Sequence, residues 1–471
     1  MRARLKAKAR RWKITALSAT KKYRCQQQRL RRCQGRIAKL EARVAELETL
    51  VQPRSIPNHS YPVQMIALAV FMVVQAKVSL RGAAKTVAYF SSLLGWSFST
   101  PSHVTVFRWV LRAGLYQFNT SLEQRGGHYA TILDESISMG GEKLLLLLGV
   151  ELNEGKFDRL KPLTGQDIEV LAMQVSPSWT AEGVCQFLEQ SAAMQPGLQI
   201  DYVVTDGGNN LRKALRDRGL DRVSDCTHLL MNLVKKQFQY SDLLSQLCAH
   251  IGTLRRQTLM GRYGYLAPPT LRDKDRFLRI FNILDWVAKI DAVWSTLDEE
   301  AYDRLAFIEK YRPLLRELEQ VRALISLTGR VFKSQGLSPA TIQAWKESLQ
   351  GWMNEQANIF ASVEMMIAAV EEYVVDHHRL IQKHGKLLCC SDIIESTFGR
   401  YKNKGGIKAI SADILKIPLY NVDITPDFVD KAMSTVSYQQ VYEWETINTS
   451  PTRYGQLKAL RERPKSASLA A

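Results

Sequence analysis

The sequence contains no long apolar run. The longest runs, Met65–Val74 and Leu144–Leu148, are shorter than the roughly 18–20 residues that cross a bilayer. No transmembrane segment is therefore predicted. The basic residues 2–13 are followed by neither an apolar stretch nor a cleavage site of small residues, so no export signal is predicted either.

Cysteine is scarce and its spacing is irregular. The chain of 471 residues has seven cysteines, an odd number, and no two are separated by two residues in a C-x-x-C pair. This pattern suggests neither a disulfide framework nor a structural zinc site. It fits a protein of the reducing cytoplasm, and we expect a cytoplasmic location.

Acidic residues are absent from the first 40 positions. The chain has 64 lysines and arginines against 46 acids, a net charge of +18, and residues 1–40 hold 15 of the basic residues. The rest of the chain is therefore nearly neutral. A concentrated basic arm favours binding to nucleic acid, because neutralised phosphates release counterions. An anionic membrane surface is the alternative. With 46% hydrophobic residues, the remainder predicts a globular protein of two to four domains.

A heptad pattern follows the basic arm of residues 1–29. Apolar residues recur at alternating spacings of three and four over residues 30–52: Leu30, Cys33, Ile37, Leu40, Val44, Leu47 and Val51. This spacing predicts a coiled coil and hence self-association as a homodimer or higher homo-oligomer. One amphipathic helix packed on its own domain is the alternative interpretation.

Residues 60–118 predict three helices, which favours a helix-turn-helix DNA-binding domain over a plain three-helix bundle. The third helix, from about residue 101 to 116, would present His103, Arg108 and Arg112 to DNA, with Val104 packed inward. Arg108 and Arg112 are candidates for contacts to bases or phosphates.

The pattern changes to strands at residue 128. Residues 128–239 predict the order β-β-β-α-β-α-β-α, typical of a mixed sheet with helices on its faces. Residues 240–388 show only helical periodicity and predict an all-helical insertion domain. Residues 389–447 complete the α/β domain with a helix at about 391–404, for which Ser391 is the expected N-cap. Residues 448–471 form a basic, polar tail.

Two aspartates end predicted strands. Asp134 follows Ile132 and Leu133, and Asp206 follows a buried strand and precedes two glycines. Burying a carboxylate is unfavourable unless something compensates it, and a metal ion is one solution. Ligand sites of open sheets lie at the carboxyl ends of strands, where these two would meet if their strands are neighbours. Ordinary turn aspartates are the alternative.

A glutamate and three basic residues lie on the helix of residues 391–404. Glu395 and Lys402 are seven residues apart, nearly two turns, so they share one face of the helix. Arg400, Lys402 and Lys404 make its end basic. A carboxylate for a metal and a lysine for a phosphate suit phosphodiester chemistry, whereas a solvated charged helix is the alternative interpretation.

Asp225 and His228 form a D-x-x-H pair where the fifth predicted strand ends. His228 could equally be an ordinary residue at the start of a helix. No second ligand pair accompanies it, so zinc binding is not predicted.

The order Asp134, Asp206, Glu395 within this pattern of strands resembles the DDE transposases and integrases of the RNase H-like superfamily. The resemblance covers roughly residues 60–410. It extends to Lys402, seven residues after the glutamate, and to the D-x-x-H motif of members with a helical insertion, which Asp225 and His228 match. Such an insertion would also explain the 189 positions between Asp206 and Glu395.

The resemblance implies a function. Asp134, Asp206 and Glu395 would bind two Mg²⁺ or Mn²⁺ ions and catalyse DNA cleavage and strand transfer at the ends of a mobile element. Lys402, with Arg400 and Lys404, would contact DNA phosphates. His228 would contact DNA or, with Asp225, order the periphery of the active site. Double-stranded DNA would be the partner and the nucleoid the location. A catalytically inactive DNA-binding regulator derived from a transposase, or another nuclease of the same fold, are the alternatives.

Overall fold

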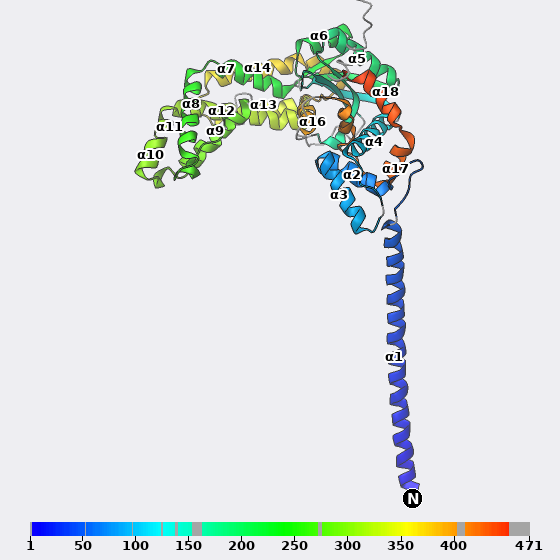
Figure 1. The fold of residues 1–471 in the computed structure, drawn as a ribbon. Helices are drawn as coiled ribbons and strands as arrows, with labels where there is room; N and C mark the ends of the chain where they lie inside the picture. Colours follow the sequence, from blue (N-terminus) through cyan, green and yellow to red (C-terminus); the bar gives the residue numbers. More distant parts are fainter. Residues whose placement is uncertain are drawn as a thin grey trace, which may run out of the picture.

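The computed structural model describes residues 2–51, 53–96, 98–123, 126–136, 140–152, 163–271, 276–402 and 410–451. These residues form a mixed α/β body, an arm of helices and one long helix that stands clear of the body (Figure 1). The predicted mixed α/β class is confirmed. No helix in the described ranges is both long and apolar enough to span a membrane.

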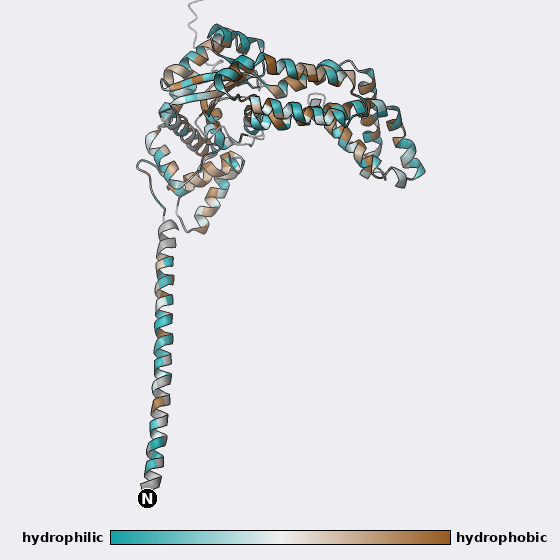
Figure 2. Cartoon of the chain, turned by 180° about the vertical axis from the view of Figure 1, so that it is seen from behind, coloured by the Kyte–Doolittle hydropathy of each residue, from teal (hydrophilic) through white to brown (hydrophobic). Residues whose placement is uncertain are grey.

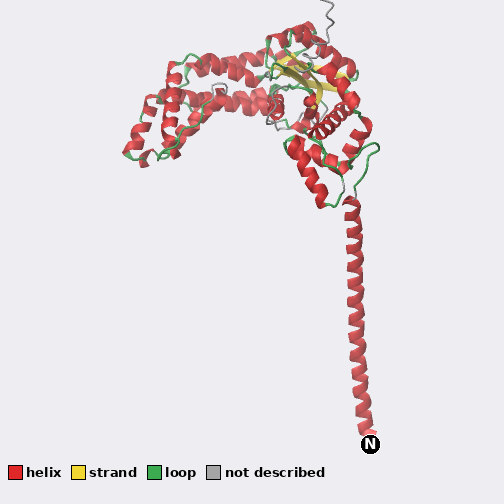
Figure 3. Cartoon of the chain, in the orientation of Figure 1, coloured by secondary structure: helices red, strands yellow, loops and turns green. Residues whose placement is uncertain are grey.

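The sheet lies inside the body, with helices on both sides (Figure 3). Its strands are β1 (Gly127–Glu135), β2 (Lys143–Glu151), β3 (Glu169–Ser176), β4 (Leu198–Thr205) and β5 (Arg222–Ser224). Their order in space is β3-β2-β1-β4-β5. β1, β2 and β3 are antiparallel neighbours, whereas β4 runs parallel to β1 and β5 parallel to β4. The two strands predicted to end in aspartates are therefore parallel neighbours at the centre of the sheet.

Side chains of each strand alternate between the two faces of the sheet. One face, which includes Leu133 and Val203, packs on α5 (Ala181–Met194) and α6 (Asn209–Asp217). The other face, which includes Ile132 and Val204, belongs to the main core that continues into the helices of the rest of the body. Asp134 lies two residues beyond Ile132 and so faces the same side as the main core.

The N-terminal helix α1 (Arg2–Val51) contains both the basic arm and the heptads. Figure 2 shows that it is mostly hydrophilic and projects from the body. The heptad residues Leu30, Ile37, Leu40 and Val44 are between 51% and 60% exposed. The interpretation of an amphipathic helix packed on its own domain is therefore wrong for these residues.

The next three helices are α2 (Val63–Val74), α3 (Leu80–Leu93) and α4 (His103–Glu123). They differ from a helix-turn-helix in two respects. Residues 94–102 join α3 to α4, whereas a helix-turn-helix has a turn of about three or four residues. In addition, one face of α4 is buried, because it packs on α2, α3, α17 and the segment η5. Val104, expected inside, is 46% exposed.

The arm of helices is distinct from the basic arm and follows α7 (Cys226–Phe238). Figure 1 shows that it extends away from the sheet and returns to it. Pro313 lies in the first turn of α12, where a proline does not interrupt the helix. The helices of the arm are α8 (Asp242–Thr258), α9 (Arg276–Asp291), α10 (Glu299–Leu305), α11 (Phe307–Lys310), α12 (Arg312–Thr328), α13 (Pro339–Asn354), α14 (Ala361–Asp376) and α15 (His378–His384).

The chain then re-enters the body. It forms α16 (Asp392–Lys402), the 3-10 segment η5 (Ala412–Leu419), α17 (Pro426–Thr435) and α18 (Tyr438–Asn448). α16 packs against β1, and η5 packs against α4. At Gly114 of α4 a Cβ atom would lie only 1.9 Å from the Leu415 carbonyl oxygen, so glycine permits this close approach. The helix with the predicted glutamate is thereby held beside the central strand.

Candidate active site

Asp134 is a buried carboxylate near the end of the central strand β1. Its side chain is 9% exposed, and one of its oxygens accepts a hydrogen bond of 2.8 Å from the backbone N–H of Glu135. Burial, together with the charges of Asp206 and Glu395, raises its pKa to about 8. Among the described residues it forms no ion pair. Its environment therefore disfavours the negative charge unless a cation is supplied.

Asp206 lies directly after β4. The pairing of β1 with β4 aligns Ile132 with Val204, and two further residues along each strand bring Asp134 level with Asp206. The Asp206 carboxylate accepts a hydrogen bond of 2.9 Å from the backbone N–H of Gly208. Gly207 between them has a φ of +89°, a conformation that glycine adopts without strain. This turn holds the second carboxylate at the end of its strand.

Glu395 reaches the same place from the first turn of α16. Its Oε1 lies 3.4 Å from Nε2 of His228 in the first turn of α7. The charge of Glu395 acts on Asp134, and burial raises the pKa of Glu395 itself. The structure thus brings Asp134, Asp206 and Glu395 together from β1, β4 and α16, although 261 positions separate the first from the last.

Asp225 ties the two helices of the site together. One of its oxygens accepts a hydrogen bond of 2.8 Å from the backbone N–H of His228 and so caps α7. The other accepts hydrogen bonds from the backbone N–H of Ser391, at 2.6 Å, and from the Ser391 hydroxyl. The Ser391 side chain, expected to cap its own helix, donates to Asp225 instead. Asp225 therefore fixes the start of α16 against the start of α7.

His228 stands between two carboxylates. Its Nδ1 lies 3.7 Å from Asp225 and its Nε2 faces Glu395. The nearby carboxylate of Asp225 raises the pKa of His228 to about 9, so the imidazolium form is favoured at neutral pH. Despite its burial, Asp225 has a pKa below its usual range because His228 and Ser391 stabilise its charge. His228 is also near enough to Asp134, Asp206 and Glu395 for the charges of these groups to influence one another.

The basic residues of α16 do not share one face. Lys402 is half-buried with Nζ 5.5 Å from the centre of the Phe398 ring, and it is close enough to Asp134 to feel its charge. Burial lowers the pKa of Lys402. Arg400 instead stacks on Tyr420, at 4.2 Å from the ring centre. Lys404 lies outside the described residues. Lys402 is thus the described basic residue of this helix that shares the site with Asp134.

The donor set fits a divalent cation of the Mg²⁺ class. The charges of Asp206 and Glu395 act on Asp134, the most buried of the three carboxylates, which has a raised pKa and no ion pair within the described residues. The ligand oxygens of the three do not all lie within 4.8 Å of one another. Hard oxygen ligands of this kind are what Mg²⁺ and Mn²⁺ prefer. Carboxylates that bind two different ions need not approach one another closely.

A second group of possible ligands lies nearby. Within the part of the chain that the structure describes, Asp225, Cys390 and Asp392 are the residues whose ligand atoms all lie within 4.8 Å of one another. Asp225 is already engaged by Ser391 and His228, and Asp392 pairs with Lys333. Burial raises the pKa of Cys390 far above neutrality, which keeps its thiol protonated. These contacts explain the cluster without an ion.

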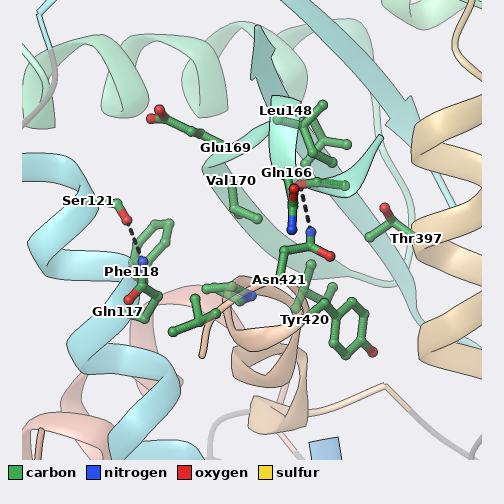
Figure 4. A pocket seen from close by; sticks show the side chains of 15 residues that line it. Gln117, Phe118, Ser121, Leu148, Gln166, Glu169, Val170, Thr397, Tyr420 and Asn421 are labelled. Carbon is green, nitrogen blue, oxygen red and sulfur yellow. Dashed lines mark hydrogen bonds between the residues drawn. The ribbon is translucent and has the colours of Figure 1, made fainter. Parts of the chain in front are cut away.

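A pocket of about 260 Å³ lies between α4 and α16. Figure 4 shows Gln117 and Ser121 of α4 on one side of it and Thr397 of α16 on the other. Asn421 crosses it with a hydrogen bond of 2.7 Å to the Gly165 carbonyl. None of the three converging carboxylates lines this pocket, so it is separate from the candidate active site.

The α4 residues expected at DNA have different environments. His103 and Arg108 are exposed, and Arg108 stacks on Tyr438 at 4.6 Å from the ring centre. Arg112 is half-buried and donates hydrogen bonds of 2.5 Å to the carbonyls of Val436 and Met433. Its guanidinium also lies 3.2 Å from His59. Arg112 therefore joins α4 to α17 and is not available to DNA in this arrangement.

Replacing Arg112 by Ala should lower the thermal stability of the protein without weakening DNA binding specifically. Loss of the two charged hydrogen bonds to buried carbonyls costs about 2 kcal/mol. Arg108→Ala on the same helix is the matched control, and it should leave the melting temperature unchanged. Thermal unfolding and a DNA-binding titration of both variants would check this. An Arg112→Ala protein of unchanged stability but reduced DNA affinity would contradict the structural role.

A comparison with protein-family models gave no match, and a comparison with curated protein sequences found no similar chain. The candidate site therefore depends on its own geometry and chemistry.

Proposed function

We propose that this protein is a DNA transposase of the DDE type, which cleaves and joins DNA strands with two divalent metal ions. The observation that carries the proposal is the convergence of Asp134, Asp206 and Glu395, from three separate elements, beside Lys402. Acidic residues scattered as turn or surface residues would not be expected to meet around a carboxylate that is 9% exposed.

The topology supports the same proposal. An antiparallel β1-β2-β3 meander followed by parallel β4 and β5, in the order β3-β2-β1-β4-β5, is the sheet that an RNase H-like domain would have. The helices from α8 to α15 lie between β5 and the glutamate-bearing α16, where an all-helical insertion domain would interrupt such a fold. The chain would then return with α16 onto β1 to complete the site.

Each residue would have a distinct part in the reaction. Mg²⁺ or Mn²⁺ ions held by Asp134, Asp206 and Glu395 would activate the attacking oxygen and stabilise the charge on the leaving oxygen of a phosphodiester. Lys402 would hold a phosphate of the DNA beside the cleaved bond, because it is near enough to Asp134 for the charge of that carboxylate to act on it. His228 would orient Glu395 through the contact at 3.4 Å, and Asp225 would keep His228 protonated.

Glu395→Gln is expected to abolish cleavage of duplexes that carry the sequences flanking the gene. The amide keeps the size of the side chain but removes its charge, so cleavage in Mg²⁺ or Mn²⁺ should fall by roughly a thousandfold or more. DNA binding should persist. Asp392→Asn, on the same helix and paired with Lys333, is the matched control and should retain cleavage.

Three results would overturn parts of this proposal. If the unmodified protein binds the duplexes but cuts none in either metal, an inactive DNA-binding regulator is favoured. If it cuts RNA in RNA–DNA hybrids but not duplex ends, it is another nuclease of this fold. Equal cleavage by the Glu395→Gln variant would show that a different residue completes the site.

A further inference from the structure

The basic arm and the heptads form one uninterrupted helix. α1 runs from Arg2 to Val51, and residues 2–29 at its N-terminal end contain eleven lysines and arginines and no acid. At 1.5 Å per residue these 28 positions span roughly 42 Å. Because the helix continues into residues 30–51, whatever fixes the heptads also fixes the direction of the basic segment.

The heptads have the composition of a two-stranded coiled coil. With Leu30 as position a, the later a positions are Ile37, Val44 and Val51, which are β-branched, and leucine fills positions d at 40 and 47. β-Branched residues at a with leucine at d favour parallel dimers. Ile37, Leu40 and Val44 are exposed in the single chain, so a second copy can cover them.

The charges beside the apolar seam specify how two copies pair. Positions g hold Arg36 and Arg43, and positions e hold Glu41 and Glu48. In a parallel pair in register, each g residue lies opposite the next e residue of the other helix, which places Arg36 against Glu41 and Arg43 against Glu48. In an antiparallel pair, g meets g and e meets e, which places like charges together. The pattern therefore favours the parallel arrangement.

We propose that two copies of the chain pair in parallel through residues 30–51 and that their basic segments, residues 2–29, diverge from the end of the coiled coil to hold one DNA duplex between them. The polarity agrees with this arrangement, because the basic segment precedes the coiled coil on the same helix, as in proteins whose paired basic helices enter the major groove. Dimerisation then doubles the number of phosphate contacts.

The inference takes DNA as its ligand from the proposed function, but it depends on α1 alone. The exposed positions Lys22, Arg24 and Arg29 are far along the chain from Asp134, Asp206 and Glu395. If the protein binds DNA through α1 but does not cut it, the pairing of α1 is supported and the proposed transposase activity is not. If it cuts DNA without contacts from α1, the reverse holds.

Cys33 offers a direct test of parallel pairing. It occupies position d and is an exposed free thiol. In a parallel pair in register the two Cys33 side chains face each other, so diamide, which accepts the two electrons and two protons, should join them by a disulfide. A covalent dimer on non-reducing gels is expected for the unmodified protein and for Cys25→Ser, but not for Cys33→Ser. Failure of the unmodified protein to form this dimer, or an undiminished dimer in Cys33→Ser, would overturn the parallel register.

The seam itself is tested by charge insertion in the full-length protein. Ile37→Lys/Leu40→Lys should make the protein monomeric by light scattering, whereas Ala38→Lys/Ala42→Lys, at the outward positions b and f, should leave a dimer. All four positions are exposed on α1, so neither variant disturbs the body. Monomers in both variants, or dimers in both, would overturn the assigned seam.

Salt dependence tests the DNA contact. Lys22→Gln/Arg24→Gln/Arg29→Gln removes three charges per chain, or six per dimer, and should reduce the slope of log affinity against log salt by about 5 on a 30-base-pair duplex. Lys22→Arg/Arg24→Lys/Arg29→Lys should keep the slope. An unchanged slope in the Gln variant would overturn the DNA contact. If the Gln variant still binds DNA but no longer binds phosphatidylserine vesicles, residues 2–29 contact a membrane surface and not DNA.

Discussion

Replacing Asp134 by Asn is expected to stabilise the metal-free protein while abolishing its DNA cleavage. Asn fits the same space and can still accept the hydrogen bond from the Glu135 N–H. It removes the buried charge that burial, Asp206 and Glu395 disfavour. Raising the pKa of this carboxyl from 3.8 to about 8 costs on the order of 4 kcal/mol of folding free energy at pH 7. The same charge is needed to bind metal, so cleavage should fall by roughly a thousandfold or more.

The pH dependence makes this prediction specific. The unfolded chain releases the Asp134 proton above pH 4, whereas the folded protein holds it until about pH 8. The stability of the unmodified protein should therefore decline between pH 4 and 8 relative to that of Asp134→Asn, and the difference should be largest above pH 8. Thermal unfolding in EDTA at several pH values would measure it.

Glu135→Gln is the matched control for Asp134→Asn. Glu135 is the next residue, but it is only half-buried and pairs with Lys143 at 2.8 Å. Its substitution should change neither the pH profile nor the cleavage rate by much, because exposed ion pairs contribute little. An Asp134→Asn protein that is less stable than the unmodified protein, or that still cleaves DNA, would contradict the account of the site.

Asp225→Ala is expected to be the most destabilising of the substitutions considered. It removes one helix cap and the acceptor of two further hydrogen bonds from Ser391, and it leaves these buried donors without a partner. We expect a loss of about 3 kcal/mol, or roughly 5–10 °C in melting temperature. The pKa of His228 should also fall from about 9, because Asp225 is the main cause of its increase.

Two comparisons isolate this role of Asp225. Asp392→Ala, which removes a partly exposed carboxylate paired with Lys333, should cost less than about 1 kcal/mol. The pKa of Asp225 lies below its usual range, so its contribution is present above about pH 4 and is lost as the pH falls further. The unmodified and Asp225→Ala proteins should become alike in strongly acidic solution. Equal melting temperatures at pH 7 would contradict the proposed role.

Local patterns predicted most of the sheet domain correctly. The order β-β-β-α-β-α-β-α expected for residues 128–239 is that of β1, β2, β3, α5, β4, α6, β5 and α7. Apolar runs bounded by Gly, Asp and Asn carry this information, because strand period and turn chemistry are local. The strand-end aspartates could be found for the same reason.

The sequence was less informative wherever long-range packing decided the outcome. Arg112 is expected to be an exposed residue of its helix. Instead α17, more than 300 positions later, packs on it, and the Arg112 guanidinium donates hydrogen bonds to carbonyls at the end of α17. Val104 was expected inside and is exposed, because the partners of α4 come from η5 and α17. The hydroxyl of Ser391, which as an N-cap would accept a hydrogen bond from its own helix, donates one to Asp225 instead. None of these partners has a local signal in the sequence.

The most direct test of the central claim is Mn²⁺ binding measured by electron paramagnetic resonance, which needs no knowledge of the DNA sequence. The unmodified protein should bind Mn²⁺, and Asp206→Asn should lose most of that binding. Asp201→Asn is the matched control, since Asp201 lies on β4, the strand that Asp206 follows, and pairs with His128 at 2.7 Å. It should bind Mn²⁺ like the unmodified protein. Equal binding by Asp206→Asn and the unmodified protein would contradict a metal centre formed by Asp134, Asp206 and Glu395.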